Sequence, residues 1–378
     1  MGCRTLQGTV FPADNPRMTP TRPSLAWLLL ALLAGNAMAD NYADGLEAYR
    51  AEDFAGARTH FEAGAAAGDM RAQFALGLLH DSGRGVDKDL ALARQWYEKA
   101  AAQGYARAQY NLGVLYAEGR GVVPDDARAR EWFVRAANQG NPDAVARMVQ
   151  FAEGGDIEAQ YRLAVMYLRG DAVKKNEKIA AQWMQRAAAR GHLEAMFGMG
   201  LLSEKGEGVE PSLNAAANWY IPAANQGHVK ATYNLARLVR DGQGQPQDSA
   251  RAEQLFEKAA QAGFVPAQLT LGMLYDLGRD WPHNPTRALA WYRLAASNGS
   301  ADAHLNLGFL YAKGEGLPVD PVEAYARTYA ADRLGHPLAA VNLGLMREQL
   351  VGDQLAQGQA RGERYVRQSG SLAGVGGN

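Results

Sequence analysis

Histidine is the residue of this chain whose chemistry includes both metal binding and proton transfer, and there are seven. Three of them, His192, His228 and His336, occupy equivalent positions in a repeating pattern, each directly after a glycine. Successive equivalent positions should lie about a helix diameter, roughly 10 Å, apart. A single metal ion binds its ligands at about 2 Å. We therefore expect these histidines to pack within the fold and predict no metal site.

Tryptophan could stack against a sugar ring or enclose a cation. Five tryptophans share another repeated position, namely Trp96, Trp132, Trp183, Trp219 and Trp291. Their neighbours are paired alanines, which are typical of close helix packing, so we expect these rings in the core. Trp281 falls where other copies carry valine, and we expect it to be buried too.

A third repeated position carries side chains suited to hydrogen bonding with a peptide. It is occupied by Asn111, Arg162, Asn234, Asn306 and Asn342 among others. An asparagine amide can both donate to and accept from a peptide backbone, so these five are the candidate partner-binding residues. Alternatively, asparagine belongs to the repeat's own consensus and bonds within its own copy. The sequence favours neither account over the other.

Catalytic motifs are absent from the sequence, including GxSxG, HExxH, the phosphate loop and the dinucleotide fingerprint. The single cysteine, Cys3, lies before the repeats, so they carry no thiolate nucleophile or cysteine ligand. A formal net charge of −1 without a polybasic run gives no sign of nucleic-acid binding. We predict a protein with no catalytic residues and no cofactor, although a carboxylate pair assembled across copies stays open.

The segment from Tyr105 to Gly140 contains the unit that positions these residues. The i, i+4, i+7, i+8 spacing of an amphipathic helix is met by Ala108, Leu112, Leu115 and Tyr116. A second apolar pattern around Trp132 predicts another helix, with Asp125 as its N-cap after a glycine-containing turn. So short a helix pair cannot stand alone, and its stability must come from stacked neighbours.

Copies do follow along the chain, with a closing glycine every 36 residues except for one interval of 51. The closing glycines are Gly68, Gly104, Gly140, Gly191, Gly227, Gly263, Gly299 and Gly335. The predicted fold is therefore an all-α solenoid of stacked helix-turn-helix repeats. An N-cap position before the second helices is occupied throughout by Asp, Asn or Ser.

The expected organisation follows from these boundaries. Residues 40–140 form an N-terminal cap and repeats, 141–155 a half-repeat that could bend the array, and 156–335 five repeats. A bend is expected because an inserted half-copy puts the stacking out of phase, but a straight, longer connection is the alternative. Residues 336–370 form a C-terminal capping repeat, and 371–378 a disordered tail.

Residues 1–39 are typical of a secretory signal peptide. Arg22 precedes the apolar run from Leu25 to Gly35, and Ala37-Met38-Ala39 matches a signal-peptidase site with a cut between Ala39 and Asp40. Met18 would give a more usual start than Met1. No later segment is long and apolar enough to span a membrane. We therefore expect a periplasmic or secreted protein, and a monomer.

The repeated motifs LGxxY, GxGV and WYxKAA, an acidic cap and a final glycine resemble the Sel-1-like repeat, a relative of the tetratricopeptide repeat, over about residues 40–370. The resemblance implies a right-handed α/α solenoid that acts as an adaptor or scaffold and is often exported in bacteria. It would bind a protein or peptide on the concave face formed by the first helices. An exported enzyme acting on cell-wall material or a β-lactam, or a secreted host-interaction factor, are the alternatives.

Overall fold

The computed structural model describes residues 41–373. The predicted signal peptide, its cleavage site and the start at Met18 lie outside these residues. Every regular element within residues 41–373 is a helix. The chain divides into two units, one ending at Ala136 and the other beginning at Ala137.

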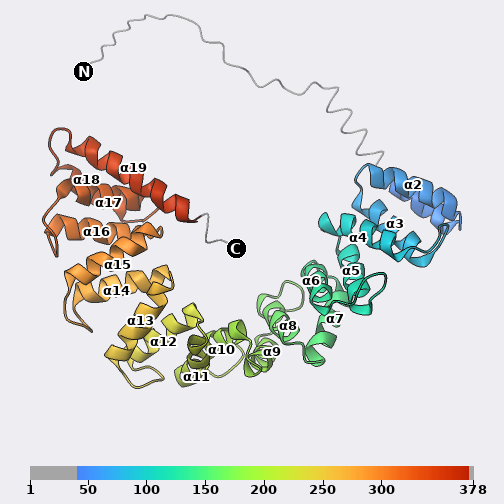
Figure 1. Cartoon of the computed structure of the whole chain (residues 1–378), viewed down its shortest axis with the longest axis horizontal. Coiled ribbons are helices and arrows are strands. Elements are labelled where there is room, and N and C mark those ends of the chain that lie inside the picture. Colours follow the sequence, from blue (N-terminus) through green and yellow to red (C-terminus); the bar gives the residue numbers. More distant parts are fainter. Residues whose placement is uncertain (1–40, 374–378) are drawn as a thin grey trace, which may run out of the picture. The chain divides into compact units, whose positions relative to one another are not determined.

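The first unit contains a helix over residues 41–50 and then pairs of helices in sequence (Figure 1). The helices are α2 (Phe54–Ala66), α3 (Met70–Ser82), α4 (Leu90–Ala102), α5 (Ala106–Glu118) and α6 (Asp126–Asn138), the last of which contains the division between the units. The first helix of each copy packs against the second helix, as α3 does against α4, and α4 then packs against α5 of the next copy.

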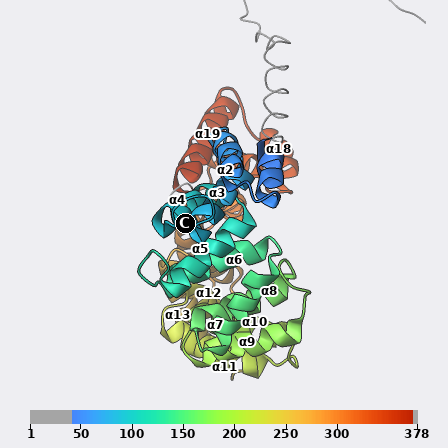
Figure 2. The same cartoon turned by 90° about the vertical axis from the view of Figure 1, so that its right-hand side faces the viewer.

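The second unit continues the same alternation after one irregular helix. Its helices are α7 (Pro142–Glu153), α8 (Ile157–Arg169), α9 (Glu177–Ala189), α10 (Leu193–Lys205), α11 (Leu213–Asn225), α12 (Val229–Asp241), α13 (Ser249–Gln261), α14 (Val265–Leu277), α15 (Pro285–Ser297), α16 (Ala301–Lys313), α17 (Pro321–Arg333), α18 (Ala339–Arg347) and α19 (Gln354–Ala373). Figure 2 shows α9, α10 and α11 side by side, and α10 packs against both. The predicted all-α solenoid of helix pairs is confirmed.

The helix boundaries follow from capping residues. Each predicted N-cap of a second helix accepts a backbone N–H with its side chain: Asp89, Asp125, Asn176, Ser212, Asp248, Asn284 and Asp320. First helices end at a left-handed glycine, as α10 does at Gly206 with φ +76°. Both signals satisfy backbone groups that a helix leaves without partners at its ends.

A second glycine in the turn lets successive copies approach closely. Gly208, with φ +73°, lies so close to the start of α9 that a Cβ atom would overlap the Glu177 carbonyl. Gly85, Gly121, Gly244 and Gly316 make the same kind of approach to the preceding copy. The paired glycines of the turn therefore have two different roles, one conformational and one steric.

The core is built from alanines, from leucines of the first helices and, on most second helices, from one large side chain. Tyr220 on α11 is fully buried, and it lies against Gly200 of α10, where a Cβ would overlap its ring. Gly272 makes the same space for Tyr292. Paired alanines such as Ala223 and Ala224 complete the contact with the next copy.

The half-repeat is a single helix, α7, that combines features of both helix types. Its N-cap, Asn141, follows the closing Gly140, as in a first helix. Its end resembles that of a second helix, because Gln160 Nε2 donates to the Ala152 carbonyl at 2.9 Å, as Gln109 does to Ala101. The bend expected at this point stays a prediction.

The C-terminal cap differs from a regular copy. Helix α19 does not pair with α18 but packs along α17 and also touches α15 (Figure 1). It runs to Ala373, three residues beyond the expected end of the cap at residue 370, so 371–373 are helical rather than part of a tail. Residues 374–378 lie outside the described part.

Candidate protein-interaction surface

Three of the four asparagines proposed to bind a partner, namely Asn111, Asn234 and Asn306, are held by tyrosines of the preceding copy. In the second unit, Asn234 on α12 donates through Nδ2 to the Tyr220 hydroxyl on α11 at 3.2 Å. Tyr220 donates in turn to Glu204 Oε2 on α10 at 2.9 Å. Arg237 Nη2 holds the other carboxylate oxygen at 3.3 Å. We call a carboxylate, tyrosine and asparagine connected in this way a triad.

Two further triads have the same spacing. Asp276, Tyr292 and Asn306 form one in the second unit, and the Tyr292 hydroxyl lies 3.3 Å from Asp276 Oδ2. Asp81, Tyr97 and Asn111 form the other in the first unit, again at 3.3 Å between hydroxyl and carboxylate. Each triad connects the two helices of one copy to the first helix of the next. The asparagine therefore bonds across copies, not within its own copy.

Burial gives these hydroxyl groups unusual proton affinity. Desolvation raises the pKa of Tyr220 above its ordinary range, the Glu204 carboxylate raises it further, and the donated bond from Asn234 opposes both effects. Burial likewise raises the pKa of Asp276. The hydroxyls stay protonated at any physiological pH, so the triads are fixed hydrogen-bond chains.

The two remaining candidates have different surroundings. Arg162 is exposed on α8, where its Nε donates to Glu158 Oε1 at 2.6 Å within the same helix. Asn342 on α18 donates to the Leu338 carbonyl at 2.9 Å, also within its own helix. Neither belongs to a triad. The structure thus joins Asn111, Asn234 and Asn306 as one type and separates Arg162 and Asn342 from them.

Part of each amide remains available to a ligand. The side chains of Asn111, Asn234 and Asn306 are half-buried. In Asn234 the donated bond uses Nδ2, and no described residue donates to Oδ1. The triad therefore fixes the amide while leaving an acceptor oxygen, which is the group that a backbone N–H of a partner would need.

Two of the three histidines, His192 and His228, are capping residues, whereas Nδ1 of His336 accepts from the Leu338 amide at 3.1 Å just before α18 and does not cap that helix. Nδ1 of His192 accepts from the Ala195 amide at 3.1 Å, and its Nε2 lies 3.0 Å from Glu158 of the preceding first helix. His228 makes the corresponding contacts with Ala231 and Glu194. Asp69, Asp156 and Ser300 cap other first helices from the same position. Both ring nitrogens are thus occupied by structural bonds, a role more specific than the expected packing.

The repeated tryptophans are half-buried and contact the core with one face. Three of them carry a cation three residues later, as in Lys99 Nζ over Trp96 at 3.9 Å and Arg186 over Trp183 at 4.4 Å. The expected core position is therefore correct for one face only. Trp281 is buried as expected and donates to the Ser249 carbonyl at 3.1 Å.

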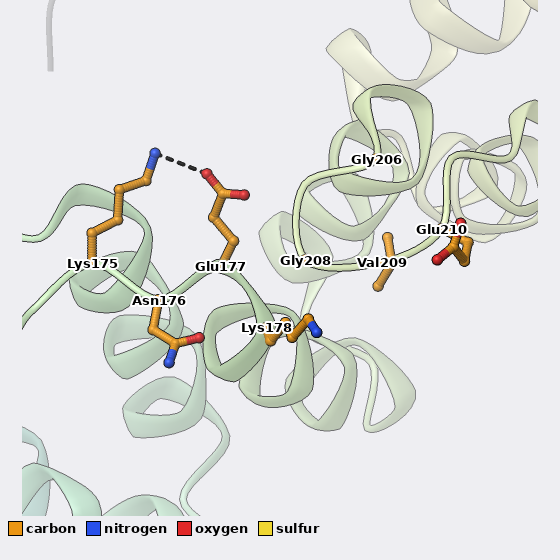
Figure 3. A pocket seen from close by; sticks show the side chains of 8 residues that line it. All are labelled: Lys175, Asn176, Glu177, Lys178, Gly206, Gly208, Val209 and Glu210. Carbon is orange, nitrogen blue, oxygen red and sulfur yellow. Dashed lines mark ion pairs between the residues drawn. The ribbon is translucent and has the colours of Figure 1, made fainter.

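A hollow of about 730 Å³ lies where the turn around Gly208 approaches the start of α9 (Figure 3). It contains side chains of both charges, and Lys175 Nζ pairs with Glu177 Oε1 at 2.9 Å. Asn176 is occupied as the cap of α9. We assign this hollow no chemistry, because Asn176 serves the helix start and Lys175 and Glu177 pair with each other.

In residues 41–373, no three His, Cys, Asp or Glu side chains are grouped to hold a metal ion. The same part of the chain has no helix with the length and apolar character for crossing a membrane.

Comparison with known proteins identifies the repeat. The Sel1 repeat family matches this chain seven times, over residues 71–105, 106–141, 157–192, 193–228, 229–264, 265–300 and 301–326, which is more than half of its length. The chain belongs to the Sel1 repeat family. Proteins of this family are generally protein-interaction scaffolds and are typically not enzymes.

Solved Sel1 repeat structures resemble the chain in part. A Sel1 repeat protein from Oxalobacter formigenes is 28% identical, covering 89% of this chain and 98% of its own, with a TM-score of 0.49. The protective antigen c5321 of uropathogenic Escherichia coli is 24% identical, covering 94% and 98%, with a TM-score of 0.32. The immunity protein Pa5087 of Pseudomonas aeruginosa is 23% identical, covering 58% and 82%, with a TM-score of 0.33. No curated protein matches. At these TM-scores none of the three structures supports a functional inference.

Sequence reasoning missed the tyrosines and carboxylates of the triads, although the Sel1 repeats carried a signal. A carboxylate 16 residues before the tyrosine and an asparagine 14 residues after it occur together around Tyr97, Tyr220 and Tyr292. Where phenylalanine replaces the tyrosine at Phe256, the two flanking positions hold Arg240 and Thr270. The three positions change together in that copy but not in the last one, where Asn342 is kept although Ala312 and Thr328 replace the carboxylate and the tyrosine.

Proposed function

We propose that this Sel1 repeat protein is a non-catalytic scaffold that binds a protein or peptide along the exposed side of its first helices. In the second unit this surface includes Asn234, Asn306 and Arg162, and in the first unit Asn111. The observation that supports the proposal is the triad, which in the second unit fixes a half-exposed amide at the same place on two first helices, α12 and α16.

Fixed amides suit this function for an energetic reason. Ordering a flexible side chain on binding costs about 0.5–1.5 kcal/mol, and a side chain already held by its own fold avoids most of that cost. In the second unit Asn234 on α12 and Asn306 on α16 share one register, with Thr270 on α14 between them, so an extended partner would meet similar acceptors on alternate first helices. Charged residues near the ends of the same helices, such as Lys205 and Asp241, vary between copies and would supply selectivity.

We propose further that the protein acts outside the cytoplasm of a bacterium, in the periplasm or after secretion. The support is the sequence of residues 1–39, with its short apolar run and Ala37-Met38-Ala39 before the repeats. A mature protein without cysteine would also have no thiol that an oxidising compartment could convert to a disulfide.

Site-specific cross-linking tests the binding surface. A photoreactive amino acid is placed at Arg162 or Lys205, which are exposed on first helices, and at Gln182, an exposed residue of the second helix α9, as the matched control. After irradiation of intact cells, we expect a discrete cross-linked species from the first two positions and none from Gln182. Fractionation of the same cells tests the location.

Two results would contradict the proposal. Equal cross-linking from all three positions would show that the first helices have no special part in binding. Specific turnover of cell-wall material or a β-lactam by the purified mature chain would show that the protein is an enzyme.

A further inference from the structure

A small pocket lies at the C-terminal end of the second unit, where α15, α16, α17 and α19 meet. Its volume is about 220 Å³. Its lining combines apolar surface with polar and basic groups, which come from Arg293, Ser297, His304, Arg327, Tyr365 and Ser369. His304 lies on the first helix α16, and the other lining side chains come from the second helices α15 and α17 and from the cap helix, with no triad asparagine among them.

His304 is the unusual member of this set. It is 1% exposed, and neither ring nitrogen has a hydrogen-bond partner within the described part of the chain. The Ala296 carbonyl lies near enough to favour the protonated ring slightly, but it is not in hydrogen-bond geometry with either nitrogen. A buried polar group left without partners costs about 1–3 kcal/mol.

Other copies show what His304 has lost. Gln268, at the equivalent position one copy earlier, donates to the Ala260 carbonyl at 2.9 Å and accepts from Asn298 at 3.0 Å. Gln73 makes the same two bonds, to Ala65 and from Gln103. For His304, the position corresponding to Asn298 is Leu334, whose side chain has no hydrogen-bond donor.

The carbonyl that His304 would have used is occupied from another direction. Ser369 Oγ on α19 lies 3.2 Å from the Ala296 carbonyl and 2.9 Å from the Tyr365 carbonyl of its own helix, so its single proton is shared between these two acceptors. Ser369 is itself buried, so the cap helix closes this side of the pocket. The histidine is thereby left lining the pocket with no internal bond.

Arg327 supplies the charge beside it. Its guanidinium lies over the Tyr365 ring, with Cζ 3.6 Å from the centroid, and its Nε donates to Glu323 Oε1 at 2.8 Å. No described residue accepts from its two terminal nitrogens. The side chain is held in one orientation while its planar pair of N–H groups remains available, the geometry that suits a carboxylate.

We propose that this pocket binds a carboxylate group, with Arg327 as the charged anchor and His304 as a hydrogen-bond donor. The charged groups that line it are Arg293 on α15 and Arg327 on α17, and beside them Glu323 on α17 pairs with both Arg327 and Arg361 of α19. Arg361 also reaches Asp320, so three arginines face two carboxylates and leave one positive charge. A single carboxylate neutralises that charge, whereas a phosphate dianion would exceed it.

The protonation state of His304 agrees with this assignment. Burial and the nearby Arg327 lower its pKa to about 4, with Glu323 opposing them and the neutral Tyr365 ring on α19 adding no charge. In the absence of an anion, the His304 imidazole is therefore neutral and has one N–H to donate. A bound carboxylate favours the protonated ring, so its binding raises the pKa of His304 and strengthens as the pH falls from neutral towards mildly acidic values.

Histidine-detected NMR on the full mature chain tests the proposal. Acetate, an acetylated tripeptide with a free C-terminus, its C-terminally amidated form, and acetyl-glutamate amide are titrated separately while the His304 ring resonances are followed. We expect saturable shifts with acetate and the other carboxylates, and none with the amidated tripeptide. The relative affinities identify the source as a small molecule, a peptide terminus or an acidic side chain.

Variants separate the roles of the two residues. Arg327→Gln should weaken binding by about 10-fold or more. His304→Gln restores the residue found in other copies, so it should fold, bind several-fold more weakly and lose the pH dependence of binding, as measured by calorimetric titration because this variant has no His304 resonances. Arg287→Gln, which removes an arginine paired with Glu253 outside the pocket, is the control and should bind as the parent does.

Three results would overturn the assignment: no carboxylate probe shifts His304, folded Arg327→Gln protein binds normally, or inorganic phosphate binds at least as tightly as acetate. The cross-linking result for the first helices is independent of these outcomes.

Discussion

Replacing Asn234 or Tyr220 separates the structural role of the triad from a role in partner binding. Tyr220→Phe removes a hydroxyl that donates to Glu204 at 2.9 Å and accepts from Asn234 at 3.2 Å. The first bond goes to a charged group and the second to a neutral amide. Loss of both, with Glu204 still held by Arg237, should lower the free energy of unfolding by about 2–3 kcal/mol.

Asn234→Ala removes only the second bond and should cost about 1 kcal/mol. The double variant should cost less than the sum of the two single variants, because each single change already breaks the shared bond. Replacing the whole triad by the residues of the next copy, with Glu204→Arg, Tyr220→Phe and Asn234→Thr, should recover part of the loss. Phe256 with Arg240 and Thr270 shows that such a copy folds.

The measurement is urea unfolding combined with hydrogen exchange of the amides of α11 and α12. Exchange is needed because repeat arrays can unfold segment by segment. Asn214→Ala, on the exposed side of α11, is the control and should change stability by no more than about 0.5 kcal/mol. If Asn234→Ala equals that control in stability yet weakens the cross-linked complex, the structural role of the triad is wrong.

Three further predictions concern the turn and the C-terminal cap. Gly208→Ala should lower the free energy of unfolding by several kcal/mol, because its Cβ would overlap the Glu177 backbone. Gly227→Ala, where φ is +89° and the space is open, should lower it by only about 1–2 kcal/mol. The urea unfolding midpoints of the two variants measure this difference. The pKa of His304 is about 4 in the fold, against an ordinary value of 6.5. Between pH 6.5 and pH 4 the unfolded chain therefore binds more protons than the folded chain. The free energy of unfolding should fall by up to about 3 kcal/mol as the pH drops through this range. His304→Gln should lack that share of the pH dependence in parallel unfolding curves. Glu323→Gln should cost about 2–3 kcal/mol, because it leaves buried arginine charge unpaired, and exchange should show the loss mainly in α19; equal loss throughout the second unit would contradict that local role.

The repeat register and the caps of the second helices could be predicted from the sequence, because each depends on residues near one another in the chain. Asp125 caps α6 through a bond that spans only three residues. The bonds of the triad asparagines span 14 residues and use a partner in another copy, as Asn234 does with Tyr220. Patterns within one copy do not contain that information.

The position of α19 could not be predicted for a related reason. Its polar, amphipathic sequence indicates a helix that ends the stack but does not say which groove it fills. The groove is set by specific contacts, in particular Tyr365 with Glu323 at 2.6 Å and Ser369 with the Ala296 carbonyl. Those contacts also form the pocket, so the pocket could not be inferred before the cap helix was placed.

Departures from the repeat pattern are of two kinds, and the difference bears on function. At Phe256 the hydroxyl, the carboxylate and the amide are all lost together, so no buried group is left without a partner. At His304 the glutamine is lost, its acceptor carbonyl is taken by Ser369, and nothing within the described chain replaces its two bonds. A buried polar side chain that has no hydrogen-bond partner within the fold can be kept when a ligand supplies the missing bond. The copy that contains His304 also contains Arg327, whose positive charge favours an anion. We therefore place a ligand there and not at the other departures.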